Sequence, residues 1–562
     1  MMLMIYAKLK QMTELKQTLR EIGFIGDVDT TAATRDDFSH DASMFELVPK
    51  AVVSPKNSED IKKLVSYVAS NKSVDSSLSI TARSAGTCMS GGAVNESIIL
   101  DMVKYMDQIF EINATHGSAQ PGLHYRDFEA QTLKHGAIMP SYPASRELCT
   151  IGGMVANNAG GEKSLQYGKT ERFVTRLKVV FADGNEYTVK PLNKTSLNKK
   201  MAQKDFEGDI YREVFKLVDT HYDEIKAAQP HVSKDSTGYH LWNVWDRSTG
   251  IFDLNQLIVG SQGTLGIVTE VQFRLVPAPK HSGTLVVFLR DITQLGDIIN
   301  VVMARKPATF EGFDNYTLML SFKLFYFFHQ TLGWWGMIKL AFQLIPDALI
   351  LFRGIPKMVL LVEFNGENAE DTVAKVHQMR LDLKPFDSKE SYEEAGTEAK
   401  ARKFWIMRRE SFNLLRKKVH DKHTAPFIDD LVVPPEHLPE FLPRLRKIIN
   451  KYKLLATVAG HMGDGNFHVI PLMNIEVASE RAKLTPCMKE VNELVLSYGG
   501  SLSGEHNDGM SRGPWLNQMY TAGIMKHFKS VKKLFDPHNI FNPHKKTDAN
   551  WEFSISHLRE HF

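Results

Sequence analysis

The sequence predicts a multidomain protein of mixed helix and strand, in the α/β or α+β class. Its 562 residues exceed what one hydrophobic core usually supports, so two or three domains are expected. Short β-rich runs broken by glycine, such as residues 177–184 and 266–276, alternate with helical patterns such as residues 58–71. Strands that alternate with helices in this way are typical of sheets covered by helices.

The chain divides into four segments. Residues 1–44 are expected to form an N-terminal helical segment, because lysines and a glutamate interrupt the uncharged apolar run that a secretory signal needs. The glycine-rich part follows at residues 45–279 and ends at the turn-forming sequence PAPK. Residues 280–545 combine strands such as 358–364 with long charged helices, and residues 546–562 form a C-terminal tail.

The composition excludes several kinds of partner and site. A net charge of +3, without a long basic stripe, gives no reason to expect nucleic acid as a partner. Three cysteines, Cys88, Cys149 and Cys487, are too few for a disulfide framework or a cysteine metal cluster. A cysteine-poor chain that lacks a secretory signal is expected in the cytoplasm.

Residues 317–353 are unusually apolar and aromatic. Their longest uncharged stretch, residues 324–338, is shorter than the roughly 20 residues of a membrane-spanning helix, so no such helix is expected. Two interpretations remain open. The segment is either a buried helical hairpin or an element that lays aromatic side chains into the inner face of a membrane. The flanking Lys323, Lys339 and Arg353 are consistent with the second interpretation.

Three glycine-rich segments, at residues 81–92, 149–170 and 259–270, carry the strongest signal in the first half. Small residues let successive backbone N–H groups converge on one anion, and a pyrophosphate would need several such turns at once. None of the three fits the Rossmann or P-loop pattern, so both of those sites are disfavoured. Short polar side chains add further donors and acceptors, namely Ser84, Thr87, Ser90, Asn157 and Asn158.

The second half carries the sequences GHMGDGNFHV and SLSGEHNDGMSRG. A turn at the Gly-Asp-Gly of the first would bring His461 and His468 side by side, and Glu505 of the second would complete a three-ligand metal site with open positions. His506 would then stand beside the ligands as a base. The alternative is that these histidines only satisfy hydrogen bonds beside a turn.

These motifs resemble those of the vanillyl-alcohol oxidase and p-cresol methylhydroxylase (PCMH) flavoprotein family. The resemblance is nearest to its branch of D-lactate dehydrogenases, glycolate oxidase flavin subunits and D-2-hydroxyglutarate dehydrogenases, and it runs from about Asp41 to Lys545. It implies an α+β fold, with a two-subdomain PCMH-type FAD-binding domain at 45–279 around noncovalent FAD. An α+β substrate domain with a central antiparallel sheet would follow at 280–545. Cys88 and Cys149 are then packing cysteines rather than flavin attachment points.

The resemblance also assigns residues to the FAD. Those implied at the pyrophosphate are Arg83, Ser84, Ala85, Gly86, Thr87, Ser90 and Gly91. Those implied on the flavin side are Gly152, Gly153, Asn157, Gly160, Gly161 and Tyr167. Gly263 and Ile267 would lie near the adenosine half, and Asn542 is a further FAD-binding residue.

At the substrate end the resemblance implies a divalent metal, zinc or manganese, on His461, His468 and Glu505, with His506 as the general base. Arg408 would bind the substrate carboxylate, with Arg409 as the alternative.

The chain departs from its hydroxyglutarate-specific relatives at several positions. Ile470 replaces an asparagine, and Ile428 and Asp429 stand where those relatives carry a lysine. Both changes remove donors for a distal carboxylate, which favours D-lactate over a dicarboxylate. Asn507 replaces a glycine in GEHNDG, which is expected to narrow the pocket or alter the backbone.

The implied activity is oxidation of a small D-2-hydroxy acid to the 2-oxo acid, by hydride transfer to FAD. The cysteines form no iron–sulfur motif, so electrons are expected to pass to a quinone, an electron-transfer flavoprotein or a partner subunit. A quinone-linked enzyme would fit a peripheral position on the inner membrane surface. Two alternatives remain: an FAD-binding electron-transfer subunit without substrate oxidation, and an enzyme similar to alkylglycerone-phosphate synthase.

Overall fold

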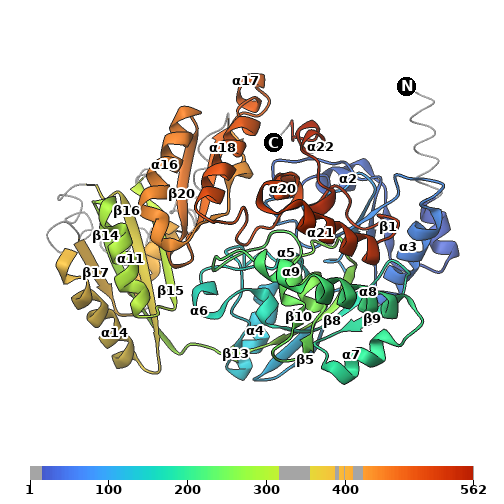
Figure 1. Cartoon of the computed structure of the whole chain (residues 1–562), viewed down its shortest axis with the longest axis horizontal. Coiled ribbons are helices and arrows are strands. Elements are labelled where there is room, and N and C mark those ends of the chain that lie inside the picture. The colour runs from blue at the N-terminus through green and yellow to red at the C-terminus, as the bar shows by residue number, and fades with distance from the viewer. Residues whose placement is uncertain (1–14, 316–354, 387–390, 398, 409–421, 561–562) are drawn as a thin grey trace.

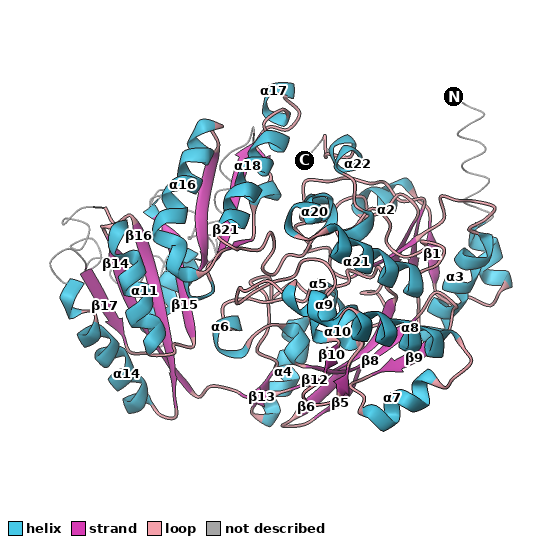
Figure 2. Cartoon of the chain, viewed as in Figure 1, coloured by secondary structure: helices cyan, strands magenta, loops and turns pink. Residues whose placement is uncertain are grey.

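The computed structural model describes residues 15–315, 355–386, 391–397, 399–408 and 422–560 (Figure 1). The aromatic segment 317–353, the alternative carboxylate-binding residue Arg409 and the beginning of the N-terminal segment lie outside these ranges. Within them, no helix is both long enough and apolar enough to cross a bilayer. The predicted α+β class is confirmed, with three main sheets that helices cover (Figure 2).

The first sheet is mostly parallel and has the order β1-β2-β4-β3. Helix α3 (Ser58–Asn71) connects two of its strands and begins where Asn57 accepts a hydrogen bond from the backbone N–H of Asp60. Ile61, Leu64 and Val68 follow at helical spacing and are buried in the core beneath the sheet. The strands are β1 (Asp27–Asp29), β2 (Ala51–Ser54), β3 (Ile80–Arg83) and β4 (Ile98–Asp101).

The second sheet is antiparallel, with the order β5-β6-β12-β8-β9. Its core includes side chains from α8 (Phe206–Thr220) and from α21 (Ala522–Phe535), a helix near the end of the chain. The C-terminal elements therefore return to the first half (Figure 1). The strands are β5 (Ile109–Ile112), β6 (His116–Ala119), β8 (Val174–Val180), β9 (Glu186–Val189) and β12 (Ile267–Arg274).

The third sheet is the central antiparallel sheet expected for the second half, in the order β17-β14-β16-β15-β20-β21-β18, with β19 paired to β21. Side chains of β14 alternate between two cores: Leu285 and Val287 face one, and Val286 and Phe288 the other. The strands are β14 (His281–Leu289), β15 (Thr309–Asp314), β16 (Met358–Gly366), β17 (Ser391–Ala395), β18 (His423–Thr424), β19 (Leu431–Val432), β20 (Leu455–His461) and β21 (Asn466–Met473). Helices α11 (Leu295–Ala304), α14 (Ala369–Asp382), α16 (Leu438–Lys451) and α18 (Leu484–Ser497) contribute to the first of these cores.

Asn542 fastens the returning chain to two of the glycine-rich loops. Its amide donates to the carbonyls of Gly92 and Gln262, at 2.8 and 2.7 Å, and its oxygen accepts from the Thr81 hydroxyl at 2.7 Å. Its backbone is left-handed, with φ of 39°, which asparagine tolerates better than most residues. Asn542 is therefore a buried clamp between loops, and its contact with FAD stays a prediction.

We expect Asn542→Ala to lower the free energy of unfolding by about 3 kcal/mol, because three buried hydrogen bonds are lost and alanine is strained at positive φ. Asn539→Ala is the matched control. Asn539 has a similar φ of 51° but donates one exposed side-chain hydrogen bond, to Asp548. Chemical denaturation of both variants measures the difference, and equal losses would contradict the clamp.

Candidate active site

One cavity of about 1190 Å³ joins the glycine-rich loops to the third sheet. It therefore brings together residues predicted for cofactor, substrate and metal from distant parts of the sequence. The predicted residues that line it are Arg83, Ser84, Ala85, Gly86, Thr87, Gly152, Gly153, Asn157, Gly263, Arg408, His468, Glu505 and His506.

Other predicted cofactor residues are within the described ranges but do not line this cavity. Ser90 donates to the backbone carbonyl of His506 and accepts from Gln262, so it ties two loops together. A Cβ on Gly161 would lie 2.1 Å from the carbonyl oxygen of Tyr142, so this glycine permits close backbone packing. The remaining members of this group are Gly91, Gly160, Tyr167, Ile267 and Asn542.

Two features of the cavity wall fit a bound dinucleotide. Gly263 has φ of +69°, and a Cβ built on it would meet no atom within 4 Å, so open space lies against the backbone. The hydroxyl of Thr150 lines the cavity and is buried without a hydrogen-bond partner in the described part of the chain. A buried hydroxyl without a partner points to a polar ligand. The cavity also exceeds the usual ~300–1,000 Å³ of small-molecule pockets.

The structure brings His461, His468 and Glu505 into one cluster. His461 ends β20 and His468 lies on β21, on either side of the short 3-10 helix Met462–Asp464 and of Gly465, whose φ is +63°. Glu505 Oε1 is 3.2 Å from His461 Nε2 and 3.3 Å from His468 Nε2, and the two Nε2 atoms are 3.4 Å apart. Bonds of ~2.1 Å to a tetrahedral metal place ligand atoms roughly 3.4 Å apart, so the three separations suit one ion.

Carboxylates hold the other nitrogen of each histidine. His461 Nδ1 pairs with Glu311 on β15, and His468 Nδ1 lies 3.2 Å from Asp429 Oδ1. Histidine ligands of metals usually hydrogen-bond a carboxylate through the ring nitrogen that does not bind the metal, which fixes the ring orientation and tautomer. Lys234, fully buried, lies 3.1 Å from the second oxygen of Glu505.

The charges in this cluster reinforce one another. Burial opposes charge on His468, yet its hydrogen bonds to Asp429 and Glu505 raise its pKa to about 10. Burial likewise opposes charge on His461, but the adjacent Glu311 raises its pKa. Burial would raise the pKa of Glu505, but Lys234 and His461 hold it well below its ordinary value. The carboxylates therefore concentrate negative potential where the histidine nitrogens meet.

His506 lies next to this cluster on a loop that Asp430 organises. Asp430 accepts hydrogen bonds from the backbone N–H groups of Glu505 and His506 and from the Ser503 hydroxyl. His506 Nδ1 lies 2.6 Å from Asp429 Oδ2, and the His506 ring stacks on His468 at 4.9 Å between centroids. A carboxylate at Nδ1 selects the tautomer whose Nε2 can accept a proton.

Arg408 lines the same cavity and contacts β15 through Glu311. Its guanidinium contacts Glu311 Oε2 at 2.9 and 3.0 Å, so Glu311 orients both Arg408 and His461.

Ile470 also lines the cavity, as expected for the residue that replaces an asparagine. Asn507 does not line it. Its amide donates to the carbonyls of Gly260 and Asn157, and its φ of 67° retains the left-handed backbone that glycine favours.

Sequence reasoning missed three of these residues. Glu311, Lys234 and the pairing role of Asp429 were not predicted, because each meets the cluster only through the tertiary fold. Asp429 offered one local signal, since two acidic residues in succession, Asp429 and Asp430, follow an apolar sequence. In the structure both are completely buried, which acidic residues rarely are without partners.

Comparison with known proteins agrees with this architecture. Residues 49–190 match the FAD binding domain model, and residues 278–546 match the model of FAD linked oxidases, C-terminal domain. The chain belongs to the FAD-linked oxidases. Among these oxidases, it is 28% identical to D-2-hydroxyglutarate dehydrogenase of Pseudomonas putida over 95% of its own length and 51% of the relative. It therefore spans about half the length of that relative.

A second relative of this FAD-linked oxidase has a similar length. Glycolate oxidase subunit GlcD of Bacillus subtilis is 28% identical over 95% of the chain and 96% of the relative. Among solved structures, p-cresol methylhydroxylase with substrate bound has a TM-score of 0.65 at 15% identity, over 97% of this chain and 98% of that one. This likeness confirms the predicted PCMH-type fold.

We expect Lys234→Met to lower the free energy of unfolding by about 3–5 kcal/mol, because Glu505 and Asp464 would lose a buried counter-charge. Chemical denaturation measures this loss. Lys204→Met, at an exposed position, is the matched control and should change stability by less than about 0.5 kcal/mol. A loss below about 1 kcal/mol at Lys234 would show that the cluster does not need this charge.

Proposed function

We propose that this FAD-linked oxidase oxidises a small D-2-hydroxy acid to the 2-oxo acid, with D-lactate as the favoured substrate. The observation that carries the proposal is one cavity, which glycine-rich loops line together with Arg408, His506, His468 and Glu505. His461 does not line the cavity but contacts His468 and Glu505. The names of the relatives, a D-2-hydroxyglutarate dehydrogenase and a glycolate oxidase subunit, support the substrate class.

Two bound groups would complete the site. The loops that line the cavity would hold FAD noncovalently, through the backbone at residues 83–87 and the glycines at 152, 153 and 263. His461, His468 and Glu505 would hold a divalent metal, zinc or manganese, which their mixed nitrogen and oxygen donors suit. When bound, FAD supplies a hydride acceptor and the metal supplies a Lewis acid for the hydroxyl and carboxylate oxygens.

The residues of the chain would bind and deprotonate the acid. Arg408 lines the cavity with its guanidinium oriented by Glu311, and it would pair with the substrate carboxylate. His506 would take the hydroxyl proton at Nε2, because Asp429 holds Nδ1 and stabilises the imidazolium that forms. Loss of that proton and of the α-hydrogen as hydride leaves the 2-oxo acid.

The cavity wall near the cluster favours a small acid. Ile470, Ala459 and Thr457 from β20 and β21 line it together with Thr424. The Ile470 side chain cannot donate a hydrogen bond, so a second carboxylate beside it would depend on the hydroxyls of Thr424 and Thr457 to replace its hydration. This dependence disfavours a dicarboxylate relative to D-lactate.

The proposed electron acceptor lies outside the chain. The word "subunit" in the name of the glycolate oxidase relative supports a partner subunit, with a quinone or an electron-transfer flavoprotein as the other candidates. We also propose that the protein is cytoplasmic and rests on the inner membrane surface through residues 317–353. Sedimentation with liposomes tests this membrane contact.

Anaerobic addition of D-lactate should bleach the flavin absorbance of the purified protein, whereas L-lactate should not. D-2-hydroxyglutarate and glycolate are compared in the same experiment. If D-2-hydroxyglutarate bleaches the flavin faster than D-lactate does, it replaces D-lactate as the favoured substrate, and the proposed reaction type is unchanged. A flavin that stays oxidised with every acid would instead support an electron-transfer subunit.

We expect His506→Ala to lower kcat by roughly 10²–10⁴, with FAD and metal contents unchanged, because the proposed general base is lost. Added imidazole should restore part of the activity, since it can take the proton in place of the missing ring. His437→Ala, outside the cavity, is the control. A kcat of His506→Ala close to that of the wild type would show that His506 is not the general base.

Exhaustive chelation should abolish substrate oxidation while FAD stays bound, and zinc or manganese should restore it. Glu505→Gln should resist this restoration, because an amide is a much weaker metal ligand than a carboxylate. Metal analysis of each sample checks that the ion has left and returned. Full activity in a protein proven free of metal would exclude the proposed ion.

A further inference from the structure

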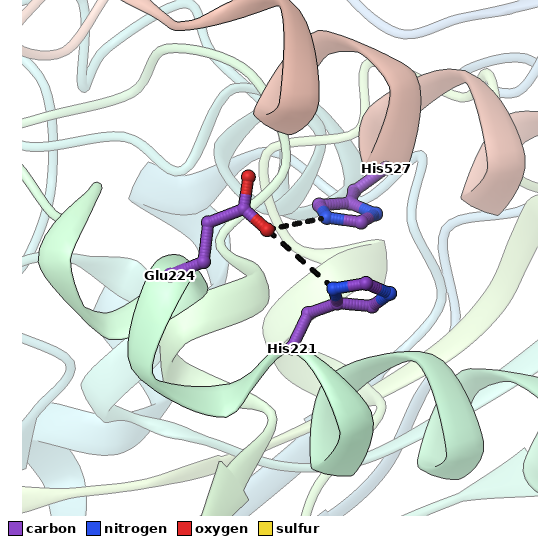
Figure 3. Close-up of side chains that lie close together, drawn as sticks. All are labelled: His221, Glu224 and His527. Atoms are coloured by element: carbon purple, nitrogen blue, oxygen red, sulfur yellow. Dashed lines mark hydrogen bonds and ion pairs between the residues drawn. The ribbon is translucent and has the colours of Figure 1, made fainter.

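Figure 3 shows a second group of two histidines and a glutamate. None of the three lines the cavity of the candidate active site. His221 stands between α8 and α9 (Tyr222–Ala227), and Glu224 lies on α9. His527 comes from α21, about three hundred residues later in the chain. None of the three takes part in the proposed oxidation.

Both histidines approach the same oxygen of Glu224 (Figure 3). Glu224 Oε2 is 3.2 Å from His527 Nε2 and 3.5 Å from His221 Nδ1, and all three ligand atoms lie within 4.8 Å of one another. The two shorter separations are close to the roughly 3.4 Å expected between ligands of one tetrahedral zinc ion. The third separation, between the two histidine nitrogens, is no more than 4.8 Å.

The exposure of the three side chains suits an ion that enters from solvent. His527 is 10% exposed, whereas His221 and Glu224 are 44% and 45% exposed. The two imidazole rings lie 4.4 Å apart between centroids. Water can therefore reach the group and occupy the remaining coordination positions.

We propose that His221, Glu224 and His527 bind a divalent transition-metal ion, of which zinc is the chemical type that two imidazoles and a carboxylate suit best. The ion joins α9 to α21 and so fastens the returning C-terminal helix to the first half of the chain. Because only the folded protein brings the three side chains together, the ion binds that state more tightly and raises its stability.

The surroundings set the strength of this site. His221 and His527 line a groove of about 1090 Å³ together with Lys216, Lys526 and Lys529. These lysines repel a cation, so the site binds zinc more weakly than a buried site of four ligands. The same positive charge favours an anion, such as phosphate or a carboxylate, as the fourth ligand of the bound ion.

Zinc titration of three variants of the FAD-loaded protein tests this site. His221→Ala and Glu224→Gln alter exposed side chains, so the fold should persist, and FAD content confirms that it does. His135→Ala is the control, because it removes an exposed histidine that belongs to none of the side-chain groups that could bind a metal ion in the described part of the chain. Equilibrium dialysis with elemental analysis counts the zinc ions per chain, and a thermal melt records the response to zinc.

We expect His221→Ala and Glu224→Gln each to bind one zinc ion fewer than the wild type, and to lose the zinc-dependent rise of the melting temperature. His135→Ala should keep both. The proposed site would be overturned if all three variants bound as many zinc ions as the wild type and showed the same rise of the melting temperature with zinc. Flavin reduction by substrate should be unchanged in every variant, so the outcome is independent of the proposed oxidation.

Discussion

The buried carboxylate of Glu505 has to be neutralised, and the cations that neutralise it come from different parts of the fold. Lys234 belongs to the first half of the chain, and His461 and His468 belong to the third sheet. A charge in the interior is tolerated only when it is paired and hydrogen-bonded. This requirement fixes how the two halves meet, and the cavity lies where they meet.

Two further carboxylates extend the same network. Glu311 on β15 contacts both His461 and Arg408, so one side chain aligns a proposed metal ligand with the proposed substrate-binding residue. Asp429 contacts both His468 and His506, which couples a proposed metal ligand to the proposed base. Each acidic residue therefore links two functions, and a change at either would disturb both.

The sequence predicted local features better than long-range pairings. The hairpin around His461 and His468 followed from a Gly-Asp-Gly turn between two short strands, and GEHNDG marked a second loop with ligand chemistry. Glycine richness identified the loops but did not separate glycines that face the cavity from those, such as Gly161, that permit backbone contact. Glu311 and Lys234 stand in unremarkable sequence, and only the fold brings them to Glu505.

The return of the C-terminal helices affects how the protein is made. Phe528 and Val531 of α21 complete the core of the second sheet, and Phe541 joins the core of the first. A ribosome delivers these residues only after the whole third sheet has been synthesised. The N-terminal half thus emerges with two incomplete cores. Their apolar surfaces stay exposed to solvent until the last part of the chain has been synthesised. Folding of the FAD-binding half is then a late event. A chain that ends before α21 would lack side chains that complete the cores of the first and second sheets.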